Sequence, residues 1–312
     1  MEKQTSHKTY HPDIVACYLY VITRHGYPPD AANTPLHMEE LARLGYSSIE
    51  LEGIREDHLK EMYRMRREIR QKSAELELQV PFFCVVLPGL SAQEEKERSA
   101  NLELFRKGCQ VARDLGAEAV LDNAPIPPWQ FPEGIPVTRH YDEEVLSGAT
   151  LSPGLNWDRY QEELVETYRT VCDIAAEFRL DYHLHPCYGA LVQTTDAFLH
   201  FSGAVKRDNL KFNLDTANQF FMKDNLFLSL IRLQDHISYI HVSDNQGDRL
   251  GHLVPGDGTI PWDRFFDTLG RIGYEGKFGI DVGGQESGVK DLEGGYRRAA
   301  GWLQENWFKY TS

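Results

Sequence analysis

Three things are missing from this 312-residue sequence, and each absence excludes a class of protein. No apolar run is long enough to span a membrane, which argues against a membrane partner. Residues 1–13 contain no apolar core of a secretory signal, so we expect a cytoplasmic protein. The five cysteines show neither a CxxC motif nor paired spacing, which argues against a disulfide framework and favours reduced thiols.

The sequence also has fewer basic than acidic residues. The chain has 33 Lys and Arg residues against 47 Asp and Glu residues, which gives a formal net charge of −14. A strongly acidic protein repels the phosphate backbone, so we expect no nucleic-acid partner. No glycine-rich turn follows the first strand-like run, and this argues against a dinucleotide-binding fold.

What the sequence does contain is a regular alternation of strand-like and helix-like segments. Most of the strand-like runs are nearly continuously apolar, as expected for parallel strands buried on both faces. Eight such strands predict a single closed (β/α)₈ TIM barrel over residues 1–312, with an open doubly wound sheet as the less favoured alternative. The predicted strands are 14–22, 48–51, 80–87, 118–121, 180–184, 210–214, 237–242 and 277–280.

One connection is unusually long for a compact barrel. Residues 125–156, after the fourth predicted strand, are rich in Pro and Gly. A connection of this length is usually functional, so we predict a lid or insertion loop on the face where a barrel active site lies. The alternative is a surface excursion without a role.

Polar side chains end four consecutive strands in the second half of the chain. Asp215, His241 and Asp281 each end a predicted strand, and His183 and His185 share one face of the strand before them. Any one of these residues alone would be an ordinary buried polar group. Together, two imidazoles and two carboxylates at the barrel mouth predict a metal site that suits Mn²⁺, Zn²⁺, Fe²⁺ or Co²⁺ better than Ca²⁺ or Mg²⁺.

Several motifs in the second half resemble those of the xylose isomerase-like TIM barrel superfamily. They are LDTAN at 214–218, YIHVSD at 239–244, PGDG at 255–258 with PWD at 261–263, and GYEGKFGID at 273–281. The resemblance covers about residues 178–285 and is weaker in the first half. The superfamily includes sugar phosphate isomerases and epimerases, ketose 3-epimerases, inosose dehydratases and endonuclease IV.

The resemblance implies one divalent metal ion, with Mn²⁺ foremost and Zn²⁺, Fe²⁺, Co²⁺ or Mg²⁺ as alternatives. Asp215, His241 and Asp281 match the family's Asp, His and final Glu ligands, and His185 matches its Glu on the fifth strand, with His183 as competitor. In the family's epimerases the two glutamates transfer protons. The substitutions therefore leave Asp281 as the best candidate base and make His185 a less certain catalytic group, because a metal-bound imidazole lacks a free lone pair.

The implied activity is that of a sugar isomerase or epimerase. It would abstract a proton next to the carbonyl of a keto-sugar or related polyol through an enediolate. Alternatives are a dehydratase or lyase acting on an inosose or 3-keto-glycoside and, less favoured, a metal-free binding protein or a subunit of a larger assembly. An endonuclease is disfavoured by the acidic charge, and a homo-oligomer is compatible with the fold. Candidate substrate contacts are His183, Asn218, Arg249, His252, Glu50 and Trp129.

Overall fold

The computed structural model describes residues 10–131 and 143–308. Within them, a parallel sheet forms a barrel, and its strands follow one another around the barrel in chain order. Each neighbouring pair in this sheet is parallel. The strands are β1 (Ile14–Ala16), β2 (Ser48–Ile54), β3 (Gln79–Val86), β4 (Ala119–Asn123), β7 (Asp181–His185), β8 (Leu210–Phe212), β9 (Leu214–Asp215), β10 (Tyr239–Val242) and β11 (Lys277–Ile280).

The barrel closes through a strand that is interrupted at Asn213. β8 pairs with β7 on one side, and β9 pairs with β10 on the other. Asn213 joins both neighbours, because its backbone N–H donates to the Leu184 carbonyl at 2.9 Å and its side-chain Nδ2 donates to the Tyr239 carbonyl at 3.1 Å. The eight strand positions therefore form a nearly closed parallel barrel, which confirms the predicted fold class.

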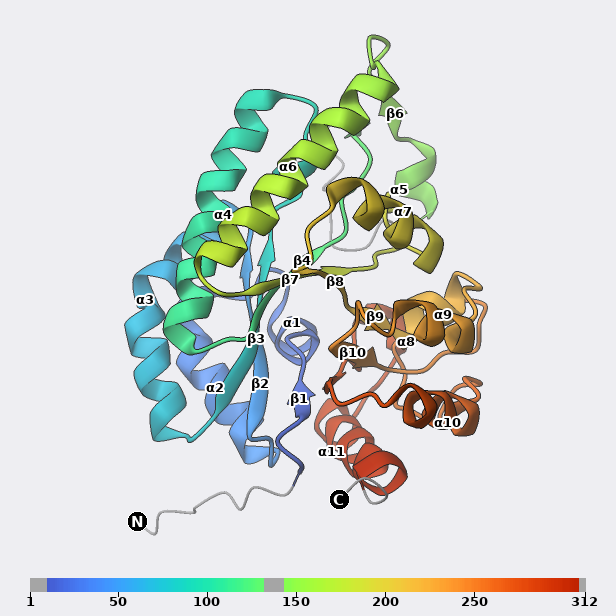
Figure 1. Cartoon of the computed structure of the whole chain (residues 1–312). Helices are drawn as coiled ribbons and strands as arrows, with labels where there is room; N and C mark the ends of the chain where they lie inside the picture. Colours follow the sequence, from blue (N-terminus) through green and yellow to red (C-terminus); the bar gives the residue numbers. More distant parts are fainter. Residues whose placement is uncertain (1–9, 132–142, 309–312) are drawn as a thin grey trace.

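Helices surround the strands on the outside. In Figure 1, α3, α4 and α6 lie on one side of the barrel and α8, α9 and α10 on the other. In the part of the chain that the structure describes, no helix combines the length and the hydrophobicity that crossing a membrane requires. The helices are α1 (Leu19–His25), α2 (Thr34–Arg43), α3 (Arg55–Glu75), α4 (Glu95–Leu115), α5 (Glu143–Ser147), α6 (Trp157–Glu177), α7 (Thr195–Val205), α8 (Thr216–Phe221), α9 (Leu226–Leu233), α10 (Trp262–Ile272) and α11 (Leu292–Leu303), with short turns at Ala31–Asn33, Pro88–Ser91, Gln285–Ser287 and Gln304–Phe308.

The predicted first strand, 14–22, is wrong in its second half. β1 ends at Ala16, and the chain turns at Cys17 and Tyr18 into α1. Every residue from 14 to 22 is buried, so the run is apolar whichever conformation it adopts. A continuous apolar run does not distinguish a buried strand from a buried helix, which is why the pattern misplaced this boundary.

The centre of the barrel is filled by aromatic side chains. The rings of Phe82 on β3 and Tyr239 on β10 stack with their centroids 3.7 Å apart, and His183 on β7 lies 5.7 Å from Phe82. The barrel is therefore closed below its mouth, as in other barrels of this size. Above this aromatic layer, the next inward-facing side chains are polar, and they lie at the carboxyl ends of the strands.

The long connection after β4 has structure of its own. Trp129–Gln130 (β5) and Thr150–Leu151 (β6) form an antiparallel pair, and α5 lies between them in the chain. The start of the connection is fixed, because the Leu191 N–H donates to the Pro125 carbonyl at 2.7 Å. Residues 132–142 of the predicted lid lie outside the described residues.

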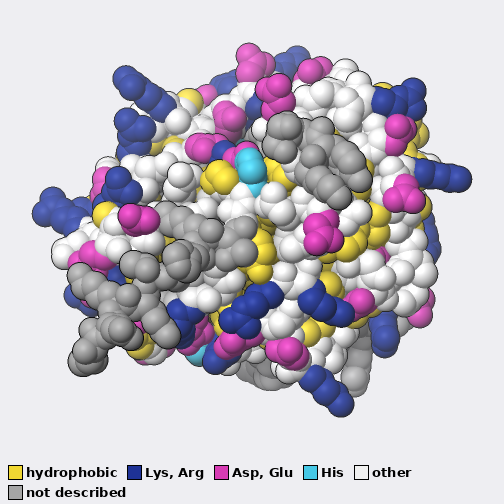
Figure 2. Space-filling view, turned by 90° about the horizontal axis from the view of Figure 1, so that it is seen from below, with side chains coloured by type: hydrophobic (Ala, Val, Ile, Leu, Met, Phe, Trp, Pro, Cys, Tyr) yellow, Lys and Arg dark blue, Asp and Glu magenta, His cyan; other side chains and the backbone are white. Residues whose placement is uncertain are grey.

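Charged side chains of both signs are interspersed on the face shown in Figure 2. Lys and Arg residues stand next to Asp and Glu residues there, and the described surface of this face carries no continuous basic area. This pattern agrees with the net charge of −14.

Candidate metal centre

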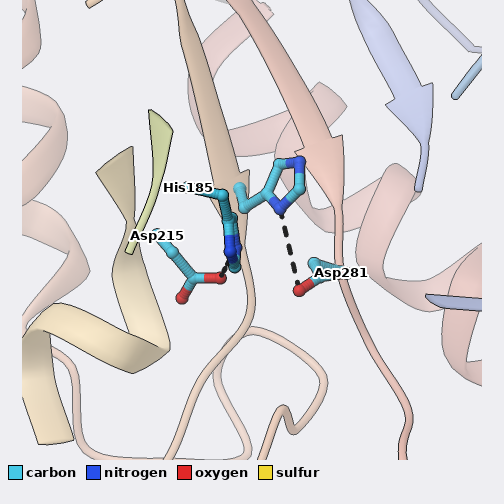
Figure 3. A group of neighbouring side chains, drawn as sticks. His185, Asp215 and Asp281 are labelled. Carbon is cyan, nitrogen blue, oxygen red and sulfur yellow. Dashed lines mark hydrogen bonds and ion pairs between the residues drawn. The ribbon is translucent and has the colours of Figure 1, made fainter. Parts of the chain in front are cut away.

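Four buried side chains meet at the mouth of the barrel: His185, Asp215, His241 and Asp281. They come from the ends of β7, β9 and β10 and from the residue that follows β11. One donor atom from each lies within 4.8 Å of the donor atoms of the other three. Figure 3 shows His185, Asp215 and Asp281 converging from three different strands. This buried His/Asp cluster suits a divalent metal ion.

Two of the donor atoms have no hydrogen-bond partner among the described residues. They are Nδ1 of His241 and Oδ2 of Asp281, which lie 3.8 Å apart. On the other side of the cluster, Nε2 of His185 lies 3.1 Å from Oδ2 of Asp215. Burying polar atoms without partners is costly, and a cation between them would remove that cost. The residues present therefore fit the metal ion that the sequence pattern predicts.

Asp215 and His185 form an ion pair within the cluster. Burial alone would raise the pKa of the Asp215 carboxyl, but the hydrogen bond and charge of His185 hold that pKa well below its usual range. Burial opposes the charged form of His185, yet its contacts with Asp215 and Cys187 raise its pKa to about 9. The second oxygen of Asp215 accepts the Asn218 backbone N–H at 2.8 Å and thereby caps α8. Asp215 is thus an ionised group whose position is fixed by the helix that follows it.

Glu50 on β2 lies against His241 and determines how its ring is oriented. The Glu50 carboxylate is 3.2 Å from His241 Nε2, and it also accepts the Tyr239 hydroxyl at 3.1 Å and the Tyr18 backbone N–H at 3.3 Å. Because a carboxylate only accepts, His241 donates from Nε2 to Glu50, and Nδ1 is the nitrogen that faces Asp281. Sequence reasoning predicted Glu50 as a substrate contact and missed this role. The alternation of Ser48, Glu50 and Glu52 with apolar residues could have indicated that these polar side chains share one face of the strand.

His252, a predicted substrate contact, approaches the cluster from the loop after β10. It is buried, its Nδ1 lies 2.8 Å from Glu286 Oε1, and its Nε2 lies 3.7 Å from Asp281 Oδ2. Burial lowers the pKa of His252, but the hydrogen bond to Glu286 and the negative charges of Asp281, Asp215 and Glu286 together raise the pKa to about 9. Glu286 follows the last strand in an irregular segment, where no sequence pattern pointed to it.

The other predicted site residues lie elsewhere. His183 is buried one layer deeper, with Nε2 3.4 Å from Ser238 Oγ, so the geometry brings His185 rather than His183 to the cluster. Asn218 contacts Asp215 through its backbone. Arg249 is exposed on the loop after β10, and Trp129 is half-buried in β5.

A small cavity opens in front of the donors. His185, His241 and Asp281 form one side of its lining, and β2, β3 and β4 supply the opposite wall. Glu50 and Glu52 also line it. Glu52 therefore joins the candidate residues as a carboxylate facing the cavity from the first half of the barrel.

The motifs after β10 hold one loop in place around Asp244. Its carboxylate accepts the backbone N–H of Gly256 at 2.9 Å, the backbone N–H of Ile260 at 3.1 Å and the Trp262 indole N–H at 2.7 Å. A Cβ atom on Gly258 would lie 2.1 Å from Asp244 Oδ1, so this position requires glycine. The HVSD, PGDG and PWD motifs are thus one hydrogen-bonded unit that positions the loop carrying His252.

Comparison with known proteins agrees with this geometry. The sequence matches the family described as "Xylose isomerase-like TIM barrel" over residues 38–306. It is 24% identical over 192 residues to the fructoselysine 3-epimerase of Escherichia coli O157:H7, which covers 61% of each chain. It is 31% identical over 72 residues to the ketose 3-epimerase of Arthrobacter globiformis, which covers 23% of each. These alignments therefore span less than two thirds of both curated relatives.

Solved structures match over nearly the whole chain. An L-ribulose 3-epimerase has a TM-score of 0.70 at 16% identity and covers 96% of this chain and 95% of its own. The IolI protein, whose structure contains a bound zinc atom, has a TM-score of 0.69 at 18% identity and covers 95% and 98%. At these identities the structures support the fold. The family match over most of the sequence shows that the chain belongs to the xylose isomerase-like TIM barrel family.

Proposed function

We propose that this protein is a divalent metal-dependent sugar isomerase or epimerase that removes a proton next to the carbonyl of a keto-sugar or related polyol. The observation that carries the proposal is the set of four buried donors, two of them with unpartnered atoms, beside a cavity that carboxylates also line. The epimerase names of the relatives above agree with it.

His185, Asp215, His241 and Asp281 would hold the ion. Their mixture of imidazole and carboxylate suits Mn²⁺ first, with Zn²⁺, Fe²⁺, Co²⁺ or Mg²⁺ as alternatives. When bound, such an ion polarises the sugar carbonyl, acidifies the adjacent C–H group and stabilises the negative charge of an enediolate. Asp215 supplies a full negative charge, and Glu50 orients His241 so that Nδ1 faces Asp281.

Two carboxylates are placed to move protons. Asp281 is buried, lines the cavity and has an oxygen with no hydrogen-bond partner in the described part of the chain, so it is the candidate base. Glu52 lines the same cavity from β2 and is the candidate for returning the proton from another side. His185 would act as a metal ligand rather than as a base, because a metal-bound imidazole has no free lone pair for proton abstraction.

The imidazole at position 185 also favours a second candidate function. Because β7 carries an imidazole at this position and not a carboxylate, the cluster lacks one of the two acid–base groups that epimerisation within it would use. Loss of a group from the neighbouring carbon, as in a dehydratase or lyase acting on an inosose or a 3-keto-glycoside, requires the same first proton abstraction by Asp281. The two functions differ only in the fate of the intermediate.

Metal analysis and isotope exchange test the proposal. The purified protein, reconstituted with Mn²⁺, is expected to hold one ion per chain, and Asp215→Asn is expected to hold less. In D₂O, a panel of ketoses, inososes and 3-keto-glycosides should reveal a substrate that gains deuterium next to its carbonyl. Deuterium in an intact sugar indicates an epimerase or isomerase, and loss of water or of an aglycone indicates a dehydratase or lyase. Substoichiometric metal after reconstitution would contradict the proposal and favour a metal-free binding protein.

A further inference from the structure

A second compartment lies beside the first cavity at the barrel mouth, and we call it the second cavity. The two cavities share Tyr27, Val86 and Asn123 in their linings, so they are adjacent compartments. The second one holds none of the four metal donors. Its position predicts that a molecule with its reacting part at the metal centre would extend into it.

The walls of this second cavity are built from fixed backbone. The start of the long connection, from Ala124 to Ile126, forms one wall, and the hydrogen bond from Leu191 to Pro125 holds it. The turn after β3 forms another wall, and there the Ser91 hydroxyl donates to the Pro88 carbonyl at 3.0 Å. The connection that is unusually long in the sequence therefore serves at its beginning to shape this compartment.

The lining is mostly apolar or aromatic. Tyr168 and Asp122 are buried and also line it, and the Asp122 carboxyl accepts the Tyr182 hydroxyl at 3.3 Å. Burial raises the pKa of the Asp122 carboxyl well above its usual range. Tyr27 and Arg55 add an aromatic ring and a guanidinium group, with Arg55 Cζ 5.8 Å from the ring centre.

Arg55 also adopts an unusual backbone conformation. Its φ of 57° is in the left-handed region, which is costly for a residue with a side chain. Strained residues of this kind cluster at ligand-binding sites. The position of Arg55 at the start of α3, between β2 and the second cavity, agrees with such a site.

We propose that the second cavity binds an aryl aglycone of the sugar whose ring occupies the first cavity, so that the substrate is a glycoside rather than a free sugar. The proposal rests on the proposed function for the placement of the sugar ring. An aromatic ring would bury its surface against the apolar and aromatic part of this lining. The Tyr27 ring and the Arg55 guanidinium that lies over it are the aromatic and cationic groups of the lining that such a ring would contact.

Calorimetric titration with two stable probes tests this proposal. The probes are 4-nitrophenyl β-D-glucopyranoside and D-glucose, each added to the Mn²⁺-loaded protein and to chelator-treated protein. Burial of the aryl group should make the glycoside bind about tenfold more tightly than glucose or better. Saturation-transfer NMR should show the nitrophenyl protons in contact with the protein.

A variant that fills the cavity provides the decisive comparison. Ile126 is half-buried in the cavity wall, so Ile126→Trp should remove the advantage of the aryl glycoside and leave glucose affinity unchanged. Ala124→Phe fills the same space from the neighbouring position and serves if the first variant does not fold. Leu36→Trp, on a side chain that is 56% exposed and away from the cavity, is the matched control and should behave as wild type.

The outcomes separate this inference from the proposed function. Two results would overturn the second cavity as an aglycone site even if the metal centre is active. One is equal affinity for the aryl glucoside and for glucose; the other is tighter binding of the aryl glucoside that both cavity-filling variants retain. An aryl advantage that persists in chelator-treated protein and in Asp215→Asn, but is lost in Ile126→Trp, supports the site. That result would hold even if metal analysis contradicts the proposed function.

Discussion

Replacing Glu50 by glutamine should weaken metal binding although Glu50 is not one of the four donors. In the native protein the carboxylate accepts three hydrogen bonds, from His241, Tyr239 and Tyr18. Burial raises the pKa of Glu50, but the charge and hydrogen bond of His241 outweigh it and hold the pKa below its usual value. The substitution removes this negative charge and replaces one acceptor oxygen by an NH₂ group, which faces a donor.

The size of the effect follows from the position of Glu50 behind a metal-binding imidazole. Loss of a carboxylate that orients such a ring typically weakens metal binding about 10- to 100-fold, which is about 1.4–2.8 kcal/mol. Glu50→Gln also leaves one buried hydrogen-bond donor without an acceptor, which should lower the free energy of unfolding of the metal-free protein by about 1–3 kcal/mol. Both effects share one cause, because both depend on the same buried carboxylate.

Chelator competition for Mn²⁺ and urea unfolding measure the two effects separately. Tyr239→Phe is the matched control, since it removes the 3.1 Å hydrogen bond to Glu50 and leaves the contact with His241. This control should lose stability by about 1 kcal/mol but keep its metal affinity. An unchanged metal affinity in Glu50→Gln, or an equal loss in Tyr239→Phe, would refute the assignment of Glu50 as the group that positions His241.

Three further predictions concern metal removal, pH and the loop after β10. Asp215→Ala should abolish metal binding, measured by elemental analysis, and leave the circular dichroism spectrum native; retained metal and full activity would contradict the ligand assignment. Burial lowers the pKa of His58 to about 4, and its Nδ1 accepts the Ile54 N–H at 3.1 Å, so the folded protein disfavours the charged ring. The stability that the neutral ring contributes is therefore present above pH 6.5 and lost as the pH falls toward 4, by about 2 kcal/mol between pH 7 and pH 5. Urea unfolding of the metal-free proteins should show that His58→Gln loses about 2 kcal/mol less stability between pH 7 and pH 5 than the native protein does. Equal losses in the two proteins would exclude His58 as the cause. Trp262→Phe removes the 2.7 Å hydrogen bond to the Asp244 carboxylate and should lower the free energy of unfolding by about 1.5–3 kcal/mol in urea; an unchanged value would show that Asp244 does not need this donor.

The strand pattern predicted the barrel well because it depends on local features. Parallel strands buried on both faces are continuously apolar, and their alternation with helices is visible without any knowledge of contacts. The same property caused the error at residues 17–22, where a buried helix follows a buried strand and both are apolar. The split at Asn213 was also invisible, since it depends on hydrogen bonds to two neighbouring strands.

The candidate metal donors were predictable because the barrel brings the carboxyl ends of its strands to one face. The residue types at those ends predicted a metal site, and the family motifs assigned it to His185, Asp215, His241 and Asp281, with His183 as the open alternative; the structure brings these four residues together. The groups around them were not predictable in the same way. Their roles depend on which side chains meet across the barrel.

The sequence by itself determined the fold class, the family and the residues that end the strands, because each of these depends on periodicity or on short motifs. Only the tertiary structure decided that Glu50 orients His241, that Glu286 holds His252, and that a second cavity adjoins the first. Glu50 and His241 are 191 positions apart in the chain. Contacts between such distant residues are set by the closure of the barrel and the packing of its interior, which no local pattern in the sequence records.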